Sequence, residues 1–169
     1  MDSIHEESLA LGRLIADLED LAKAEAGQLE LNLNLVAIDD IINKVLDLVR
    51  ERAEEKGVSL EKDLHESGPL LLKLDPDRIN EVLRNLIENA IRHTPEGGKV
   101  SLGLRQNGES AILSVSDTGE GIPRDDLPHI FERFYRVDKS RSRATGGSGL
   151  GLTITKKIVE AHGGSITVE

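Results

Sequence analysis

The chain has 169 residues, 38% hydrophobic and 31% charged, which is enough for one principal domain with a core of ordinary size. One Tyr, two Phe and no Trp leave that core to aliphatic side chains, and the absence of cysteine excludes disulfides and thiolate metal sites. No apolar run approaches the roughly 20 residues of a membrane span, and the acidic N-terminus is unlike a signal peptide, so we expect a soluble chain. The net charge of -10 argues against nucleic-acid binding.

The charge is unevenly distributed. Residues 1–66 hold the whole acidic excess, whereas residues 67–169 carry acids and bases in equal number. Within that neutral part lies a cationic stretch with Asp138 as its single acid, formed by Arg133, Arg136, Lys139, Arg141 and Arg143. A solvated loop explains such a run, and so does a site for an anion.

The first predicted element is a helix over residues 4–22. Mostly apolar residues recur at intervals of four and three and so form a stripe along one face of this helix. The stripe contains Ile4, Ser8, Leu11, Ile15, Leu18 and Ala22, and Leu14 and Leu21 widen it. One helix cannot bury such a stripe alone, so the spacing indicates a coiled coil or a four-helix bundle. Packing onto the main domain is the alternative.

The next elements alternate between strands and helices. Leucines at every second position from 29 to 35 predict a strand, and Asp39 is the expected N-cap of a helix that ends near Gly57. Residues 58–64 and 70–74 are short strand candidates. An amphipathic helix over residues 78–93 follows the start signal Asp75-Pro76-Asp77.

The last third begins with a hairpin, because Asn107-Gly108 separates strand candidates at residues 100–104 and 111–116. Residues 123–150 are rich in Gly, Ser, Arg and Asp, with a short helical piece expected at 127–134. A final helix over 152–161 stops at Gly163-Gly164, and residues 165–169 are expected to begin another strand. Hairpins rather than crossovers predict an α+β fold: a two-layer α/β sandwich whose mixed sheet is covered on one face by helices, with an N-terminal bundle-type helix.

The helix at residues 78–93 has a chemically dense polar face. It carries Arg78, Glu81, Asn85, Glu88, Asn89 and Arg92. Asn85 and Asn89 point the same way, and their neutral amide oxygens suit a Mg²⁺ ion that phosphates already neutralise. Arg92 lies where it could meet those phosphates. Taken alone, two such asparagines are more often solvated than functional.

Two glycine-rich segments follow. In DTGEGIP, Asp117 can accept a hydrogen bond from an amine edge such as that of adenine, while the glycines let a flat ring approach the backbone. A tight turn explains this segment almost as well. GGSGLGL, residues 146–152, runs into a helix whose exposed N–H groups suit phosphate, and a flexible linker is the alternative.

In this order, the three elements resemble the ATP-binding domain shared by histidine kinases, gyrase, certain chaperones and mismatch-repair ATPases. NLIENAIRH resembles the N box, DTGEGIP the first glycine box, FERFYRVD the F box and GGSGLGL the second glycine box of sensor histidine kinases. The helix ending in DLEDLAKAEAGQLEL resembles the second helix of the dimerisation and histidine-phosphotransfer domain. The resemblance implies part of that domain at residues 1–26, and at residues 27–169 a C-terminally truncated catalytic ATP-binding domain with its ATP lid at about 133–150.

The resemblance also implies roles for individual residues. Asn89 would be the magnesium ligand with Asn85 supporting it, and Arg92 would contact phosphate. His93, where many relatives have Tyr, would sit beside the ribose or base. Arg136 would stabilise the transferring γ-phosphoryl group. The remaining residues implied at the nucleotide are Asp117 at adenine with Gly119, Gly121 and Ile122, Tyr135 from the lid, and Gly147, Ser148, Gly149, Leu150, Gly151 and Leu152 around the phosphates.

Members of this family that hydrolyse ATP use a glutamate one turn before the magnesium asparagine. Asn85 occupies that position, and a neutral amide cannot take a proton from water, so we expect phosphoryl transfer rather than fast hydrolysis. Glu81 and Glu88 share the face and stay open as alternative bases. His5-Glu6 resembles the phosphoacceptor but lacks the following Thr-Pro or Ser-Pro, and His65, His129 and His162 lack an acceptor motif. The acceptor histidine is therefore expected outside this chain.

The expected function is that of the ATP-binding catalytic core of a sensor histidine kinase. It would transfer the γ-phosphoryl of Mg-ATP to a histidine, for relay to an aspartate of a response regulator. The expected partners are ATP, a second subunit through the helical bundle of the full-length protein, and the response regulator. The expected location is the cytoplasmic portion of a bacterial inner-membrane protein. The alternatives are an ATP hydrolase or chaperone-like ATPase, and a degenerate nucleotide-binding regulator.

Overall fold

The computed structural model describes residues 2–64, 70–108, 110–137 and 148–169, and the chain divides into two compact units. One unit combines Met1–Glu30 with Ile122–Glu169, and the other is Leu31–Gly121. The predicted division at residue 26 between a bundle helix and a catalytic domain stays a prediction.

The unit Leu31–Gly121 contains all the strands of the described residues. A three-stranded sheet has the order β2-β4-β5, in which β2 (Ser59–Asp63) is parallel to β4 (Lys99–Asn107) and β4 is antiparallel to β5 (Ser110–Asp117). β1 (Asn34–Ala37) and β3 (Leu71–Leu74) form a separate antiparallel pair. The predicted mixed sheet is therefore confirmed.

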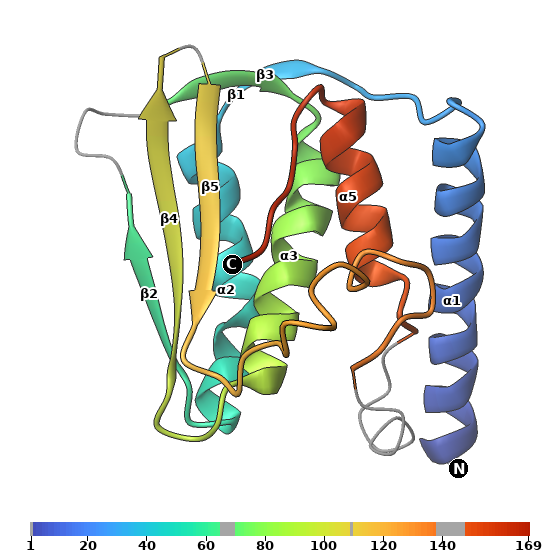
Figure 1. Cartoon of the computed structure of the whole chain (residues 1–169), viewed down its shortest axis with the longest axis vertical. Coiled ribbons are helices and arrows are strands. Elements are labelled where there is room, and N and C mark those ends of the chain that lie inside the picture. The colour runs from blue at the N-terminus through green and yellow to red at the C-terminus, as the bar shows by residue number, and fades with distance from the viewer. Residues whose placement is uncertain (1, 65–69, 109, 138–147) are drawn as a thin grey trace. The chain divides into compact units, whose positions relative to one another are not determined.

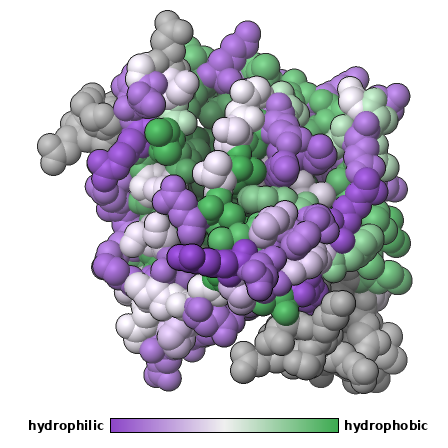
Figure 2. Space-filling view, viewed as in Figure 1, coloured by the Kyte–Doolittle hydropathy of each residue, from purple (hydrophilic) through white to green (hydrophobic). Residues whose placement is uncertain are grey.

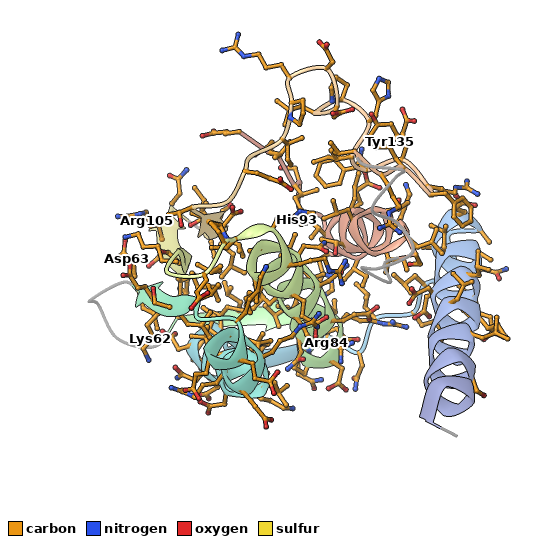
Figure 3. The ribbon with its side chains drawn as sticks, turned by 90° about the horizontal axis from the view of Figure 1, so that it is seen from below. Lys62, Asp63, Arg84, His93, Arg105 and Tyr135 are labelled. Carbon is orange, nitrogen blue, oxygen red and sulfur yellow. The ribbon has the colours of Figure 1, made fainter. Side chains whose placement is uncertain are left out.

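Two helices, α2 (Ile38–Glu55) and α3 (Pro76–His93), lie on one face of the three-stranded sheet (Figure 1). The alternation of β4 explains this layering, since Val100, Leu102 and Leu104 are buried while the residues between them are half-buried. These side chains join one aliphatic core with the apolar faces of both helices. The open face of the sheet carries ion pairs such as Arg105 with Asp63 at 2.7 Å (Figure 3). The predicted two-layer α+β fold is confirmed.

The helix α3 begins where its sequence signal predicted. The carboxylate of Asp75 accepts hydrogen bonds from the backbone N–H groups of Asp77 and Arg78, at 3.0 and 3.1 Å. The apolar side of this amphipathic helix is buried, and Leu86 is half-buried. The buried residues are Ile79, Val82, Leu83, Ile87, Ala90 and Ile91.

Two expectations at the start of this unit were wrong in detail. Asp39 is not the N-cap of α2, because the helix begins at Ile38 and its N-cap is Ala37, two residues earlier. The Asp39 carboxylate instead accepts a hydrogen bond from the backbone N–H of Leu70 at 3.2 Å. The strand expected over 29–35 is confined to Asn34–Ala37, since β3 offers it only four partner residues.

The unit formed by Met1–Glu30 and Ile122–Glu169 contains α1 (Asp2–Glu25) and α5 (Gly151–Ala161), which contact each other. Leu21 of α1 is buried, but Leu11, Ile15 and Leu18 are 58, 51 and 42% exposed. The apolar side chains of α1 lie along the right-hand side of the space-filling view (Figure 2). Among the described residues of the predicted stripe, these three large apolar side chains are therefore exposed. Among the helices that the structure describes, none combines the length and hydropathy of a membrane span.

Three other expectations differ from the structure. Residues 127–134 form successive hydrogen-bonded turns rather than a helical piece, because Pro128 cannot donate a backbone hydrogen bond. Residues 165–169 are irregular, not a strand, which would need a hydrogen-bonded neighbour. In the hairpin, Asn107 pairs with Ser110 and belongs to β4, so the turn begins at Gly108, whose φ is 61°.

Candidate functional site

The polar face of α3 brings together the three side chains that the sequence singled out there. Asn85, Asn89 and Arg92 follow one another at helical spacing and are all half-buried. The described residues contain no group of three or more His, Cys, Asp or Glu that could hold a metal ion. The amide pair fits Mg²⁺, which usually keeps water and substrate phosphates as its other ligands and needs no cage of protein carboxylates.

Backbone donors run out at the last turn of any helix, and in α3 two side chains donate to the carbonyls of that turn. The hydroxyl of Thr94, which is fully buried, donates to the carbonyl of Ala90 at 2.7 Å. From the end of α2, the ammonium group of Lys56 donates to the carbonyl of Ile91 at 2.7 Å and also to that of Arg92. Burial, together with the positive charges of Arg52 and Arg92, lowers the pKa of Lys56.

Residues 117–121, here the Asp117 loop, follow β5 and pack against this helix end. The Asp117 carboxylate accepts a hydrogen bond from the N–H of Gly119 at 2.8 Å. Thr118 is paired twice with Lys99, through its backbone N–H at 3.1 Å and its hydroxyl oxygen at 3.0 Å. A Cβ on Gly119 would lie 2.5 Å from the carbonyl oxygen of His93. The Asp117 loop and the C-terminal end of α3 therefore meet within one unit.

His93 makes a second link between the same two segments. Its Nδ1 lies 3.1 Å from a carboxylate oxygen of Glu120, and the two side chains are 57 and 60% exposed. Figure 3 shows His93 at the end of α3. Sequence reasoning selected His93 but missed Glu120, because nothing in the spacing of DTGEGIP marks which residue faces the helix.

Gly119 allows a direct test of this packing. We expect Gly119→Ala to reduce the free energy of unfolding by about 1–3 kcal/mol, the usual cost of overpacking, because the new methyl would overlap the His93 carbonyl and the Asp117 carboxylate. Gly12→Ala is the control, since a Cβ there meets nothing within 4 Å and alanine favours a helix. Urea unfolding followed by circular dichroism measures both. Equal stability of Gly119→Ala and the wild type would contradict the close contact.

In the other unit, the F box is joined to the second glycine box through the backbone. The N–H of Phe134 donates to the carbonyl of Gly149 at 3.0 Å, and a Cβ on Gly149 would lie 2.9 Å from the Cα of Phe134. Phe134 has a φ of 60°, a left-handed conformation that is unfavourable for a bulky residue. Such strain is concentrated at functional segments. Sequence reasoning missed Phe134 because no propensity signal marks this conformation.

The start of α5 has the features expected of an anion site. Leu150 is its N-cap and provides no side-chain hydrogen bond to the helix. Gly151 and Leu152, both half-buried, form its first turn, and the hydroxyl of Ser148 accepts from the N–H of Leu150 at 3.3 Å. Backbone N–H groups of an uncapped first turn are available to phosphate. Gly147 lies outside the described residues.

The predicted lid residues Tyr135 and Arg136 are half-buried in this same unit. The hydroxyl of Tyr135 donates to the Asp126 carboxylate, and this hydrogen bond, with burial and the carboxylate charge, raises the pKa of Tyr135. Arg133 forms an ion pair with Glu25 of α1. Ile122 is 39% exposed. Other predicted positions lie outside the described residues: Lys139, Arg141, Arg143, His65 and the side chain of His5.

Comparison with known proteins agrees with these features. Residues 74–169 match the family of histidine kinase-, DNA gyrase B-, and HSP90-like ATPases. The chain belongs to this family. One curated relative is the sensor histidine kinase WalK of Bacillus subtilis, which is 40% identical over 91% of this chain and 25% of that protein. Another is the sensor protein SrrB of Staphylococcus aureus, which is 37% identical over 97% of this chain and 28% of that protein. The chain thus spans about a quarter of the length of these relatives.

Solved structures of family members have the same fold. The histidine kinase AdeS of Acinetobacter baumannii is 32% identical with a TM-score of 0.77, over 95% of this chain and 72% of that one. Full-length ShkA in complex with AMPPNP is also 32% identical, with a TM-score of 0.81 over 96% of this chain and 33% of that one. This family member is therefore an ATP-binding domain of the sensor histidine kinase type.

Proposed function

We propose that this chain is the ATP-binding catalytic core of a sensor histidine kinase, which transfers the γ-phosphoryl group of Mg-ATP to a histidine outside residues 1–169. The parent protein would pass that group to an aspartate of a response regulator. The observation that supports the proposal best is the packing of the Asp117 loop against the last turn of α3, the helix that carries Asn85, Asn89 and Arg92.

Each side chain on α3 has a distinct proposed role. The amide oxygen of Asn89 would hold Mg²⁺, with Asn85 supporting it from one turn earlier. Mg²⁺ supplies charge neutralisation for the triphosphate when it is bound. Arg92, one turn beyond Asn89, would bind a phosphate oxygen, and His93 would lie beside the ribose or base.

The Asp117 loop would bind the base. One carboxylate oxygen of Asp117 holds the N–H of Gly119, and the other would accept a hydrogen bond from the exocyclic amine of adenine. Gly119 and Gly121 would let the ring approach the backbone, and Ile122 would add apolar contact. The acceptor oxygen of Asp117 would favour adenine, which presents an amine to it, over a base that presents a carbonyl at the same position.

The lid and the start of α5 would bind the phosphates. Residues 147–152 would wrap them with backbone N–H groups, and Tyr135 would approach the nucleotide from the lid. Arg136 would stabilise the charge that develops on the transferring group.

The identity of residue 85 provides a test of transfer against hydrolysis. We expect the wild-type chain to bind Mg-ATP but to release phosphate slowly, because an amide at this position cannot act as a base. Asn85→Glu should raise steady-state phosphate release by at least about tenfold, a fraction of what a well-placed general base contributes. Asn85→Gln is the control, since glutamine has the same length as glutamate but carries no carboxylate. Fast phosphate release by the wild type would contradict the proposal and favour a hydrolase with Glu81 or Glu88 as base.

The proposed partners follow from α1 and from the relatives. The uncovered Leu11, Ile15 and Leu18 would pair with helices of a second subunit in a bundle. Because the relatives are about four times longer, we propose that the sensory region and any membrane attachment belong to the rest of the parent protein, with this portion on the cytoplasmic side of the bacterial inner membrane.

A further inference from the structure

We infer that Lys56 is a positioning residue of the nucleotide site. It acts by closing the last turn of α3, which carries Asn89 and Arg92 and against which the Asp117 loop packs. The inference rests on the proposed function, because it concerns how that site is held in shape. Lys56 itself would not touch the nucleotide.

The position of Lys56 follows from the end of α2. The helix stops at Glu55, with Lys56 as its C-cap and Gly57 at a φ of 68°, and this turn directs the chain into β2. Gly97 donates a backbone hydrogen bond to the carbonyl of Gly57 at 2.8 Å, which fixes the Lys56 turn to the segment after α3. The turn at Lys56 and the turn after α3 are therefore hydrogen-bonded to each other, and this places the ammonium group of Lys56 at the end of α3.

At that end, Lys56 replaces hydrogen bonds that the helix cannot make for itself. Thr94 satisfies the carbonyl of Ala90 through both its backbone N–H and its hydroxyl. The next two carbonyls, those of Ile91 and Arg92, accept from the ammonium group of Lys56. The following carbonyl, that of His93, lies against Gly119. A positive charge also suits the negative end of the helix dipole.

Removal of the ammonium group would take away the charged donor that these two carbonyls share and loosen the support of the Asp117 loop. The side chains of Asn89 and Arg92 would then sample several positions, only one of which binds Mg-ATP. The apparent affinity would fall by the fraction of molecules in that conformation. The surrounding charges belong to several elements and nearly balance. They are Arg52 on α2, which pairs with Glu88 at 3.6 Å, Arg92 and His93 on α3, Glu96 after it, and Glu120 in the loop.

The test is the equilibrium dissociation constant for Mg-ATP, measured by calorimetry on the 169-residue chain. Lys56→Met removes the charge and keeps the apolar stem, and we expect it to weaken binding about tenfold, the factor that corresponds to one charge-assisted hydrogen bond. Lys62→Met is the matched control, because Lys62 donates to the side chain of Asn43 at 2.9 Å on the other side of α2 and should leave binding unchanged.

A pH profile separates positioning from a merely structural role. Between about pH 7 and about pH 10, the wild type should lose affinity as Lys56 loses its proton, since its pKa is lowered, whereas Lys56→Arg should not follow that decline. This comparison also decides the matter if Lys56→Met does not fold. The inference would be overturned if Lys56→Met bound Mg-ATP as tightly as the wild type does. It would also be overturned if the affinities of the wild type and Lys56→Arg declined in parallel as the pH rises. Failure of the wild type itself to bind Mg-ATP would instead overturn the proposed function.

Discussion

Replacement of Asn89 by aspartate is expected to weaken Mg-ATP binding by at least about 100-fold, or about 2.7 kcal/mol. The two side chains have the same shape, so the helix should be preserved, but the new carboxylate adds a negative charge beside a triphosphate that already exceeds the charge of its metal ion. The half-buried position of Asn89 limits the solvent screening that would soften this repulsion. Calorimetric titration with Mg-ATP measures the change.

Asn43→Asp provides a matched control for that substitution. Asn43 is an exposed residue of α2, and its side-chain oxygen accepts a hydrogen bond from Lys62. The same change of charge there should leave the affinity within about twofold of the wild type, since the distance and solvent screen it. If Asn89→Asp and Asn43→Asp bind Mg-ATP equally well, Asn89 is not at the phosphates.

Asp117→Asn is expected to have an effect of similar size, again about 100-fold, for a different reason. Asparagine keeps the oxygen that accepts from Gly119, so the loop should retain its turn. Its amide nitrogen, however, presents a donor to the donor amine of adenine, which leaves both groups unpaired in the complex. The measurement is the preference for ATP, given by the dissociation constant for GTP divided by that for ATP. This ratio should fall, because a base that presents a carbonyl loses less binding than adenine does.

The control for Asp117→Asn is Asp63→Asn, which removes a carboxylate from the open face of the sheet, where Asp63 pairs with Arg105 (Figure 3). Exposed ion pairs contribute at most about 1 kcal/mol, so neither folding nor nucleotide binding should change much. An unchanged preference for ATP over GTP in Asp117→Asn would show that Asp117 does not bind the base.

The parts of the fold that sequence predicted best are those with a local physical cause. Asp75 and Pro76 set the start of α3, and the alternation of Val100, Leu102 and Leu104 set the buried face of β4. The errors arose where tertiary partners decide. Asp39 is well placed to cap α2 by sequence, but its carboxylate is taken by the backbone of Leu70, more than thirty residues away along the chain. The leucines before residue 34 alternate, yet no partner strand lies opposite them among the described residues.

The candidate site divides in the same way. Helical spacing is sufficient to place Asn85, Asn89 and Arg92 on one face of one helix, and their roles at the nucleotide stay predictions that rest on the family resemblance. Lys56 and Glu120 could not be found like this, since each reaches α3 from another element and neither lies in a periodic pattern. The left-handed backbone of Phe134, which donates a hydrogen bond to Gly149, likewise has no signal in the sequence. Supporting residues of this kind become visible only in three dimensions.

The most direct test of the proposed phosphoryl transfer uses the full-length parent protein with Mg²⁺ and ATP labelled at the γ-phosphate. The labelled protein is then treated with acid and with alkali, and free phosphate is followed in parallel. Phosphoryl transfer to histidine predicts a phosphoprotein that is labile to acid and stable to alkali, with little free phosphate. Rapid release of phosphate without such a phosphoprotein would contradict the proposal.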